Sequence, residues 1–415
     1  MKKKISLIIR NAAELVTLDN GNLSPRTGGA MRDLNIIEDG AVAIHKDKII
    51  AAGPTKKIIS KYQAKKIIYA RGKTVTPGLI DSHTHLVFAG DRANEFEMRL
   101  QGATYQEIAA AGGGIKSTVE ATRKASKSDL KAEALKRMNR FLAYGTTTIE
   151  AKSGYGLNVK DEVKMLEVIK ELDGVHDVDI IPTFLGAHEI PPEYKGNKEG
   201  YINLLIKEMI PAVAKRKLAG FCDVFCEKNV FEITDSRRIL TEAKKYGFKI
   251  KMHADEFAQL GGAELAAELG AVSADHLMAI SDNGIRAIRE KGVIATLLPG
   301  TTFALGLSNY APARKIIDSG CAVALATDFN PGTSFTESLP IIMTLACVKM
   351  KMTPAEALCA ATINAAHAVS RQDTIGSISP GKQADIVIWD IPSYRHIPYH
   401  LGVNLADTVI KKGKI

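Results

Sequence analysis

The sequence is poor in cysteine, and the few cysteines present do not suggest cross-links. Five occur in 415 residues, an odd number for a large chain. Such usage is typical of a reducing compartment, where cysteines serve as small buried apolar residues rather than as a disulfide framework. Cys222 and Cys226 have a loosely metal-like spacing, but they lie in an apolar strand-like run and no second pair completes a site. We expect core packing for both, and a cytoplasmic protein.

The sequence also lacks a long apolar run. No stretch is long and apolar enough to span a bilayer. The first residues, MKKKISLIIRN, resemble a secretion signal only briefly, because Arg10 and Asn11 end the apolar run at once. We therefore expect neither a membrane partner nor export.

Aromatic residues are few as well, at 6% of the chain, and they are not interleaved with the basic residues. The formal charge of +9 comes from short lysine clusters, such as residues 2–4 and the segment KKGK near the last residue. A nucleic-acid surface typically combines a basic stripe with stacking aromatics. We interpret these lysines as solvated surface, and we expect a small-molecule substrate and no nucleic-acid partner.

Between residues 70 and 370, apolar β-branched runs alternate with helical patterns, as is typical of βα units around a parallel sheet. The predicted strands end near His85, Lys152, His188, Cys226, His253, His276, Pro299 and Asp328. Eight units predict an α/β fold, a (β/α)₈ TIM-type barrel, with an open doubly wound sheet as the alternative. Ser117 to Glu120 and Thr353 to Glu356 have the pattern of capping boxes at helix starts.

The two ends of the chain depart from this pattern. Residues 1–69 and 371–415 show strand-like alternation with turns. A tail of roughly forty residues cannot bury a core alone. We therefore predict two domains: a small composite β-sandwich built from residues 1–69 and 371–415, and a barrel domain of residues 70–370 that carries the catalytic site.

Histidines and acids gather where the barrel strands are expected to end, which is the face where barrel active sites are built. His83 and His85, two residues apart, would project to the same face of a strand. With His253 and Asp328 they form an N₃O ligand set for one divalent metal ion, zinc or iron, and leave a position for water. Such an ion would lower the pKa of the water and polarise a carbonyl group, which predicts a hydrolase.

Asp328 and a further residue at a strand end, His276, are candidates for handling the proton of the water. Asp328 can accept it, and His276 can hold or orient the water from the opposite side. A purely structural histidine is the alternative for His276.

The segments TPGLIDSHTH, SADH and ATDFNPG resemble the amidohydrolase superfamily. The resemblance implies hydrolysis of C–N or related bonds in a metal-bearing barrel flanked by a composite β-sandwich. Several members hold two ions bridged by a carboxylated lysine on the fourth strand, where this chain has Cys226 and Glu227. The resemblance therefore implies the single-metal branch, and Lys152 on the second strand is expected to be a structural ion-pair residue.

Longer segments narrow the resemblance to one branch: FAGDRANEFEMRLQGATYQEIAAAGGGI, IEAKSGYGL, FLGAHEIPPEY, KMHADEF, SADHL and DFNPGT. That branch opens the cyclic amide of an imidazolone bearing a propanoate side chain, in histidine degradation, and the resemblance suggests a homodimer. It implies substrate contacts for Arg92 and Tyr155, since an arginine can bind a carboxylate through two parallel hydrogen bonds. A solvated arginine and a packed tyrosine are the structural alternatives.

The same resemblance implies further roles. His188 is expected to polarise or hydrogen-bond the ring carbonyl. Glu256, three residues after His253, is expected to bind the substrate and transfer a proton at a ring nitrogen, with a carboxylate at a helix start as the alternative. Asn330, Gly332 and Thr333, in a turn after Asp328, are expected to hold the amino-acid-like end of the product.

Two other functions stay open. A purine or pyrimidine deaminase would also suit a glutamate near the metal, but it has no obvious use for the anion-binding pair Arg92 and Tyr155. A catalytically silent barrel that serves as a scaffold needs no ligands at four separate strand ends.

Overall fold

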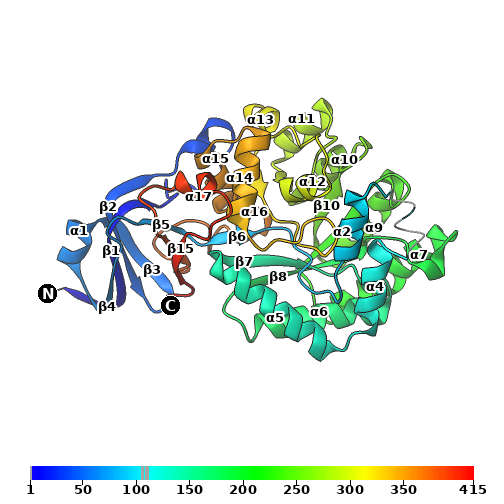
Figure 1. The fold of residues 1–415 in the computed structure, drawn as a ribbon, viewed down its shortest axis with the longest axis horizontal. Coiled ribbons are helices and arrows are strands. Elements are labelled where there is room, and N and C mark those ends of the chain that lie inside the picture. The colour runs from blue at the N-terminus through cyan, green and yellow to red at the C-terminus, as the bar shows by residue number, and fades with distance from the viewer. Residues whose placement is uncertain (1, 104–106, 108–111) are drawn as a thin grey trace.

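The computed structural model describes residues 2–103, 107 and 112–415. Across these residues the strands form two sheets, one of eight strands and one of seven. The seven-stranded sheet lies at one end of the molecule with both chain termini beside it, and the larger helical body lies at the other end (Figure 1).

The eight-stranded sheet is parallel, and its strands follow one another in chain order. The strands are β6 (Leu79–Asp81), β7 (Thr146–Lys152), β8 (Asp179–Ala187), β9 (Phe221–Cys226), β10 (Lys249–Ala254), β11 (Ser273–His276), β12 (Ile294–Leu297) and β13 (Val323–Leu325). Beyond the ends of β6 and β13, Asp328 N–H donates to the carbonyl of His83 at 3.0 Å, and His85 N–H to that of Phe329 at 2.8 Å. These bonds join the first strand to the last, which confirms the predicted barrel over the open sheet.

Most of the helices surround the barrel, where the amphipathic ones bury an apolar face, while the helix of residues 55–61 packs on the seven-stranded sheet. In α6, for example, Val163, Leu166 and Ile169 recur at helical spacing and are buried. The helices are α1 (Thr55–Lys61), α2 (Ala93–Leu100), α4 (Ile115–Lys124), α5 (Lys127–Ala143), α6 (Val159–Asp173), α7 (Lys198–Leu204), α8 (Ile210–Lys215), α9 (Ile233–Lys245), α10 (Gly262–Leu269), α11 (Asp282–Lys291), α12 (Pro299–Ala304), α13 (Ala313–Asp318), α14 (Leu339–Met350), α15 (Pro354–Ala360), α16 (Ile363–Ala368) and α17 (His396–Tyr399). Within the described residues, none of the helices has both the length and the apolar character needed to cross a bilayer.

One of the two predicted capping boxes is confirmed. Thr353 accepts the backbone N–H of Glu356 at the start of α15, and the carboxylate of Glu356 accepts that of Thr353. The other is wrong, because α4 begins at Ile115 and Ser117 lies inside it, where its hydroxyl donates to the carbonyl of Gly114.

The predicted first barrel strand, TVTPGLIDSHTH, is divided between the two sheets. β5 (Thr74–Pro77) pairs with β1 (Lys3–Val16) and β14 (Ile386–Trp389), while β6 alone joins the barrel. Gly78 connects them at a close approach, since a Cβ there would lie 2.2 Å from the hydroxyl oxygen of Thr147. The chain therefore passes from one sheet to the other with almost no linker.

The seven-stranded sheet has the order β15-β14-β5-β1-β2-β3, with β4 also paired to β1. Its other strands are β2 (Ile36–His45), β3 (Lys48–Pro54), β4 (Tyr62–Tyr69) and β15 (Ala406–Ile410). β1 pairs with β4 through its first half and with β5 near its end, so the sheet bends around its own core of residues such as Leu7, Val42 and Ile386. Both chain ends thus contribute to one sheet. The exact domain limits, 1–69 plus 371–415 and 70–370, stay a prediction.

Candidate active site

A cavity of about 590 Å³ lies among the residues that follow the barrel strands. Its lining includes ten of the predicted site residues: His85, Arg92, Tyr155, His188, His253, Glu256, His276, Asp328, Asn330 and Thr333. His83 is not part of the lining and is fully buried. Gly332 also lies outside the lining, against Arg92.

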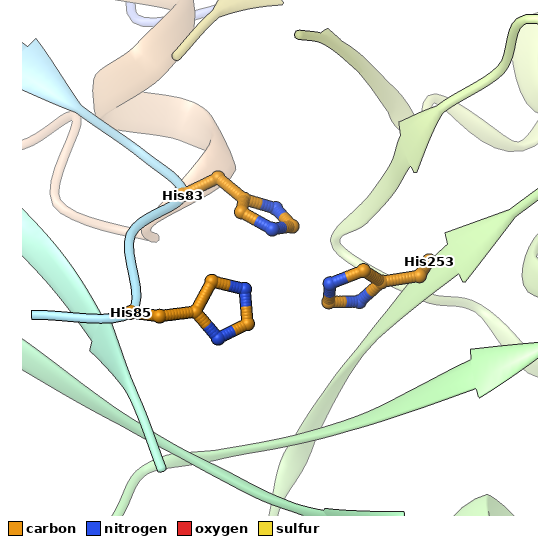
Figure 2. A group of neighbouring side chains, drawn as sticks. All are labelled: His83, His85 and His253. Atoms are coloured by element: carbon orange, nitrogen blue, oxygen red, sulfur yellow. The ribbon is translucent and has the colours of Figure 1, made fainter. Parts of the chain in front are cut away.

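Three imidazole rings converge beside this cavity. His83 and His85 follow β6, His253 projects from β10, and the rings face a common space in Figure 2. One nitrogen of each lies within 4.8 Å of a nitrogen of both others. Asp328 Oδ1 lies 3.5 Å from Nε2 of His83 and 3.5 Å from Nε2 of His85. The structure therefore brings together the four residues predicted as metal ligands.

These four residues fit a divalent metal ion. Nε2 of His83 and Nε2 of His253 are buried and have no hydrogen-bond partner among the described residues, a costly arrangement unless something binds them. Burial, reinforced by neighbouring positive charge, holds the pKa of His83 and His85 well below its usual value. Their imidazoles are therefore neutral, as metal ligands must be.

Two aspartates set the orientation of two of the rings. Asp275 Oδ2 lies 2.7 Å from Nδ1 of His83, and Asp223 Oδ2 lies 3.0 Å from Nδ1 of His253. For His83 the carboxylate accepts the proton of Nδ1, so the lone pair of Nε2 faces the common space. For His253 the carboxylate lies close to Nδ1 without the alignment of a hydrogen bond. Sequence reasoning missed both aspartates, although an acidic residue inside the apolar strand FCDVFC is a signal that could have found Asp223.

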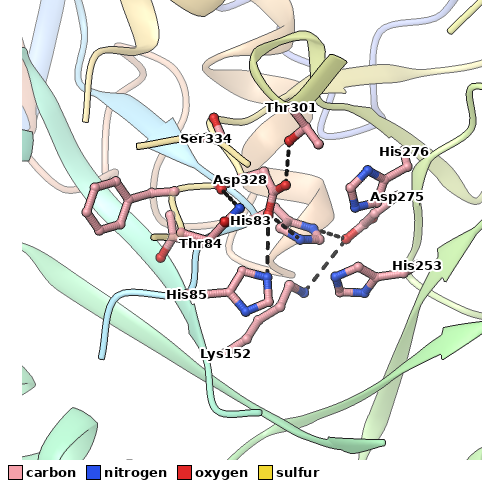
Figure 3. A network of polar contacts seen from close by, with 12 residues as sticks. His83, Thr84, His85, Lys152, His253, Asp275, His276, Thr301, Asp328 and Ser334 are labelled. Atoms are coloured by element: carbon pink, nitrogen blue, oxygen red, sulfur yellow. Dashed lines mark hydrogen bonds and ion pairs between the residues drawn. The ribbon is translucent and has the colours of Figure 1, made fainter. Parts of the chain in front are cut away.

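Asp328 is held in an unusual conformation. Its φ is +52°, and that of His276 is +77°, a region that costs a non-glycine residue on the order of 1 kcal/mol or more. The hydroxyl of Thr301 donates to Asp328 Oδ2 at 2.5 Å, which leaves Oδ1 facing the histidines (Figure 3). Thr301, at the start of α12, was not anticipated from the sequence.

Arg92 and Tyr155 reach the cavity from two loops. Arg92 Nη1 lies 3.9 Å from Glu95 Oε2, and its guanidinium lies against the backbone of Gly332, where a Cβ would be only 1.5 Å from Nη2. The ring centroid of Tyr155 lies 5.7 Å from that of His85. Burial raises the pKa of Tyr155, so its hydroxyl stays protonated and can donate a hydrogen bond.

His188 has a defined tautomer. Its Nδ1 lies 2.9 Å from the carbonyl oxygen of Gly154, and because that oxygen can only accept, Nδ1 carries the proton. Burial, with the charges of His85 and His253, holds the pKa of His188 well below its usual value. The ring is therefore neutral, and Nε2 is an acceptor.

Glu256 and His276 lie side by side, with Oε1 and Nδ1 3.5 Å apart. Burial, reinforced by the charges of Asp328 and Glu227, raises the pKa of Glu256 well above its usual value. Burial also lowers the pKa of His276 to about 3. The site thus favours the protonated form of the Glu256 carboxyl and keeps the imidazole of His276 neutral.

Residues 330–333 form the predicted turn. Asn330 Oδ1 accepts the backbone N–H groups of Gly332 and Thr333, both at 2.8 Å, and Asn330 Nδ2 donates to the carbonyl of Asp328 at 2.6 Å. The side chain of Asn330 therefore fixes the turn to Asp328. That these residues contact a ligand stays a prediction.

Comparison with known proteins agrees with this geometry. The model of the amidohydrolase family matches residues 74–415. An imidazolonepropionase of Geobacillus sp. (strain WCH70) is 54% identical over 413 residues, covering 99% of this chain and 97% of the relative. An imidazolonepropionase of Alkaliphilus metalliredigens (strain QYMF) is 49% identical over 413 residues, covering 99% of this chain and 98% of the relative.

Solved structures share the fold at low sequence identity. An adenosine deaminase from Xanthomonas campestris with bound zinc superposes with a TM-score of 0.73 at 18% identity, covering 100% of this chain and 93% of that one. A triazine hydrolase from Arthrobacter aurescens gives a TM-score of 0.73 at 17% identity, covering 98% of this chain and 94% of that one. At such identities the likeness extends to the fold alone.

Proposed function

Because the chain belongs to the amidohydrolase family, we propose that it hydrolyses the cyclic amide of 4-imidazolone-5-propanoate to N-formimino-L-glutamate, a step of histidine degradation. The observation that carries this proposal is one cavity lined by Arg92 and by three residues of the histidine–aspartate cluster, His85, His253 and Asp328. An arginine suits the propanoate group of such a substrate. The near-complete coverage of relatives named imidazolonepropionase supports the same assignment.

The proposed cofactor is one zinc or iron ion bound by His83, His85, His253 and Asp328. When bound, the ion supplies Lewis acidity that polarises a carbonyl group and lowers the pKa of a water molecule. An N₃O ligand set accepts either metal, so availability and ligand geometry decide between them.

Substrate binding falls to Arg92, Tyr155, His188 and the turn of residues 330–333. Arg92 binds the propanoate carboxylate through two N–H groups, and the hydroxyl of Tyr155 donates to the same anion. The tautomer of His188 makes Nε2 an acceptor. We therefore propose that His188 Nε2 accepts a hydrogen bond from an N–H group of the substrate ring, in place of the expected bond to the ring carbonyl. Asn330, Gly332 and Thr333 form the turn against which the amino-acid-like end of the product lies.

Proton transfer falls to Asp328 and Glu256. Asp328 Oδ1 accepts a proton from the attacking water, whose oxygen bonds to the ring carbonyl carbon, and His276 orients that water. The C–N bond then breaks, and the carbonyl carbon becomes that of a new carboxyl group, which releases the second proton of the water to solvent and leaves as a carboxylate. Glu256, whose protonated form is favoured by burial, gives a proton to the departing ring nitrogen. Asp328 then returns its proton to Glu256 through solvent, so that one water is consumed per bond broken.

The direct test is loss of the ultraviolet absorbance of 4-imidazolone-5-propanoate on adding the purified protein, before and after treatment with a chelator. We expect turnover that stops when the metal is removed and resumes when zinc or iron is restored, with elemental analysis deciding between the two. Absence of turnover in a folded, fully metal-loaded sample would refute the substrate assignment.

The same sample tests the alternatives. Ammonia release from adenosine, guanine or cytosine would indicate a deaminase, and the anion-binding pair Arg92 and Tyr155 argues against it. A silent scaffold is disfavoured by the buried, unpartnered nitrogens of His83 and His253 within the described structure.

We also propose that the enzyme acts as a cytoplasmic homodimer that binds no nucleic acid. All five cysteines lie among the described residues and none forms a disulfide, in keeping with a reducing compartment. The side chains of Tyr399 and Leu401, 81% and 65% exposed, offer apolar surface beside α17 for a subunit contact. Light scattering of the purified protein would give its subunit number.

A further inference from the structure

Five charged side chains lie buried in the barrel interior beside the histidine cluster. They come from four barrel strands, and each has no exposed surface: Glu150, Lys152, Asp223, Lys251 and Asp275. Removing a charge from water costs several kcal/mol unless partners compensate. Two ammonium groups here face three carboxylates, so the group as a whole is nearly balanced. Because this burial is costly and lies next to the proposed metal site, we expect these charges to contribute to that site.

Lys152 contacts the same oxygen atoms that orient the histidines. Its Nζ lies 2.7 Å from Asp223 Oδ2 and 3.7 Å from Asp275 Oδ2. Those two oxygens are the ones that lie 3.0 Å from Nδ1 of His253 and 2.7 Å from Nδ1 of His83. One ammonium group therefore bridges the partners of two separate ligand rings, as the contact to Asp275 in Figure 3 illustrates.

Neighbouring groups hold Lys152 and the strand ends in place. Glu150 Oε1 accepts from Lys152 Nζ at 3.0 Å, and Glu150 Oε2 lies 3.1 Å from Lys251 Nζ. Lys251 also donates to the backbone carbonyl of Ser82 at 2.8 Å, immediately before His83. Burial alone would lower the pKa of Lys152, but the charges of Asp223, Glu150 and Asp275 outweigh it and raise the pKa. Lys152 is therefore a permanent cation.

We propose that Lys152 is a positioning residue of the metal centre, which fixes the rings of His253 and His83 through Asp223 and Asp275 and so determines how firmly the protein retains its metal ion. The inference rests on the proposed metal site but not on the proposed substrate, and its test therefore uses metal binding rather than turnover.

Two effects of Lys152 oppose each other, and the positioning effect dominates. Its positive charge repels a divalent cation, so removing it would strengthen metal binding if charge alone mattered. Removing it also takes away the ammonium group that lies 2.7 Å from Asp223 Oδ2 and 3.7 Å from Asp275 Oδ2, so neither carboxylate is held in place against its ring. Loss of such an orienting contact typically weakens metal binding by about 10- to 100-fold.

The experiment compares Lys152→Met with Lys411→Met, both loaded with Co²⁺. Lys411 is a suitable control because it is also a buried lysine between two carboxylates, Asp179 and Asp385, whereas the carboxylates at Lys152 are the ones that contact His83 and His253. For Lys152→Met we expect an altered visible spectrum of the bound cobalt and loss of cobalt to a chelator about 10-fold faster or more. Lys411→Met should keep the spectrum and the loss rate of the unmodified protein, even if it unfolds at lower temperature.

A folded Lys152→Met protein with an unchanged cobalt spectrum and loss rate, or with slower loss, would overturn the proposal. If circular dichroism shows that this variant does not fold, Asp223→Asn decides instead, because it preserves side-chain volume and removes the same link to His253. Its control is Asp179→Asn. Faster cobalt loss from Asp223→Asn alone supports the proposal, and equal loss from both variants contradicts it.

Discussion

Gly332 makes room for the guanidinium group of Arg92. A Cβ at residue 332 would lie 1.5 Å from Nη2 and 1.9 Å from Cζ of Arg92. Arg99 Nη2 donates to the carbonyl of Gly332 at 3.3 Å, which holds the backbone on its other side. The glycine is thus required by a close contact between side chain and backbone, a reason that differs from the ligand contact expected from the sequence.

We predict that Gly332→Ala impairs substrate binding more than the chemical step. The added methyl group must displace Arg92, and loss of one charge-assisted hydrogen bond of about 1.5 kcal/mol corresponds to a rise in KM of roughly tenfold. Steady-state kinetics would separate KM from kcat. Gly220→Ala, at a glycine with nothing within 4 Å of the added carbon, is the matched control. A KM equal to that of the unmodified enzyme would show that Arg92 does not bind the substrate in this position.

The contact between Thr301 and Asp328 leads to a second prediction. Thr301→Val preserves shape and removes the donor to Asp328 Oδ2, which frees that carboxylate to rotate. We expect kcat to fall by roughly tenfold, as for loss of a hydrogen bond to a charged group. Thr302→Val is the control, since the hydroxyl of Thr302 contacts the sulfur of Met278 instead. Equal kcat values for both variants would exclude a role for Thr301 in orienting Asp328.

The histidines and Asp328 were predictable because they follow a repeated local pattern, a polar residue directly after an apolar strand. Thr301, Asp223 and Asp275 were not, because their importance depends on contacts between segments distant in the chain. Asp275 contacts His83 across 192 positions. An isolated aspartate in a strand does not reveal which ring it will meet.

Among the elements, the loop after β7 depends on a helix that follows it. Glu162, in the first turn of α6, is fully buried, and its carboxylate accepts the backbone N–H groups of Gly154, Gly156 and Leu157 at 2.7 to 3.1 Å. Burial raises the pKa of Glu162, although these donors oppose the shift. The loop they hold carries Tyr155 and the carbonyl group that fixes the tautomer of His188.

We predict that Glu162→Gln loosens this loop. The amide keeps the volume of the side chain, but its NH₂ group must face a backbone donor, and an unsatisfied buried donor costs about 1 to 3 kcal/mol. KM for the imidazolone should rise several-fold, and the midpoint of thermal unfolding should fall. Glu171→Gln, on the exposed surface of the same helix, tests whether a change of charge on α6 alone has such effects. Unchanged KM together with lowered stability would limit Glu162 to a structural role.

Prediction of the elements succeeded where their signals are local. Six of the eight strands end within two residues of the predicted positions, while β6 and β13 end at Asp81 and Leu325, before the predicted His85 and Asp328. These strand patterns and the capping box at Thr353 depend on signals within a few residues. The division of TVTPGLIDSHTH did not follow from the sequence, because a strand pattern indicates conformation but not which strand will be its neighbour. Ser117 also shows this limit, since its spacing to Glu120 suits a cap although the helix begins two residues earlier.

At the scale of the whole molecule, a buried ion-pair cluster joins the barrel to the seven-stranded sheet. Lys411, just after β15, has its Nζ 2.8 Å from Asp179 Oδ2 at the start of β8 and 2.6 Å from Asp385 Oδ2 just before β14. Burial would raise the pKa of Asp179, but the charge of Lys411 outweighs it and lowers the pKa from 3.8 to about 2. The junction therefore contributes a pH-dependent part of the stability.

We predict that this contribution is lost in acid. Because the pKa of Asp179 is lower in the folded state, its stabilisation of about 2 kcal/mol is fully present above pH ~4 and declines as the pH falls toward 2. The free energies of unfolding of Asp179→Asn and of the unmodified protein, measured with a denaturant, should therefore differ at pH 7 and converge between pH 4 and pH 2. Asp318→Asn removes an exposed ion pair with Arg314. Its free energy of unfolding should differ from that of the unmodified protein by less than about 1 kcal/mol at any pH. A constant difference for Asp179→Asn across this range would contradict the assignment.

The passage from β5 to β6 through one residue also limits how the protein can be dissected. A chain shortened to residues 70–370 would keep β5 while deleting β1 and β14, the two strands that flank it. The unpaired backbone of β5 would then be open to other chains, as exposed sheet edges generally are. The same strand leads, four residues after Pro77, to the aspartate of the Asp81–His85 segment that carries two of the proposed metal ligands. The catalytic half of the molecule is thus a poor candidate for isolation, transplantation or fusion by itself, and any minimal version must include β1 and β14.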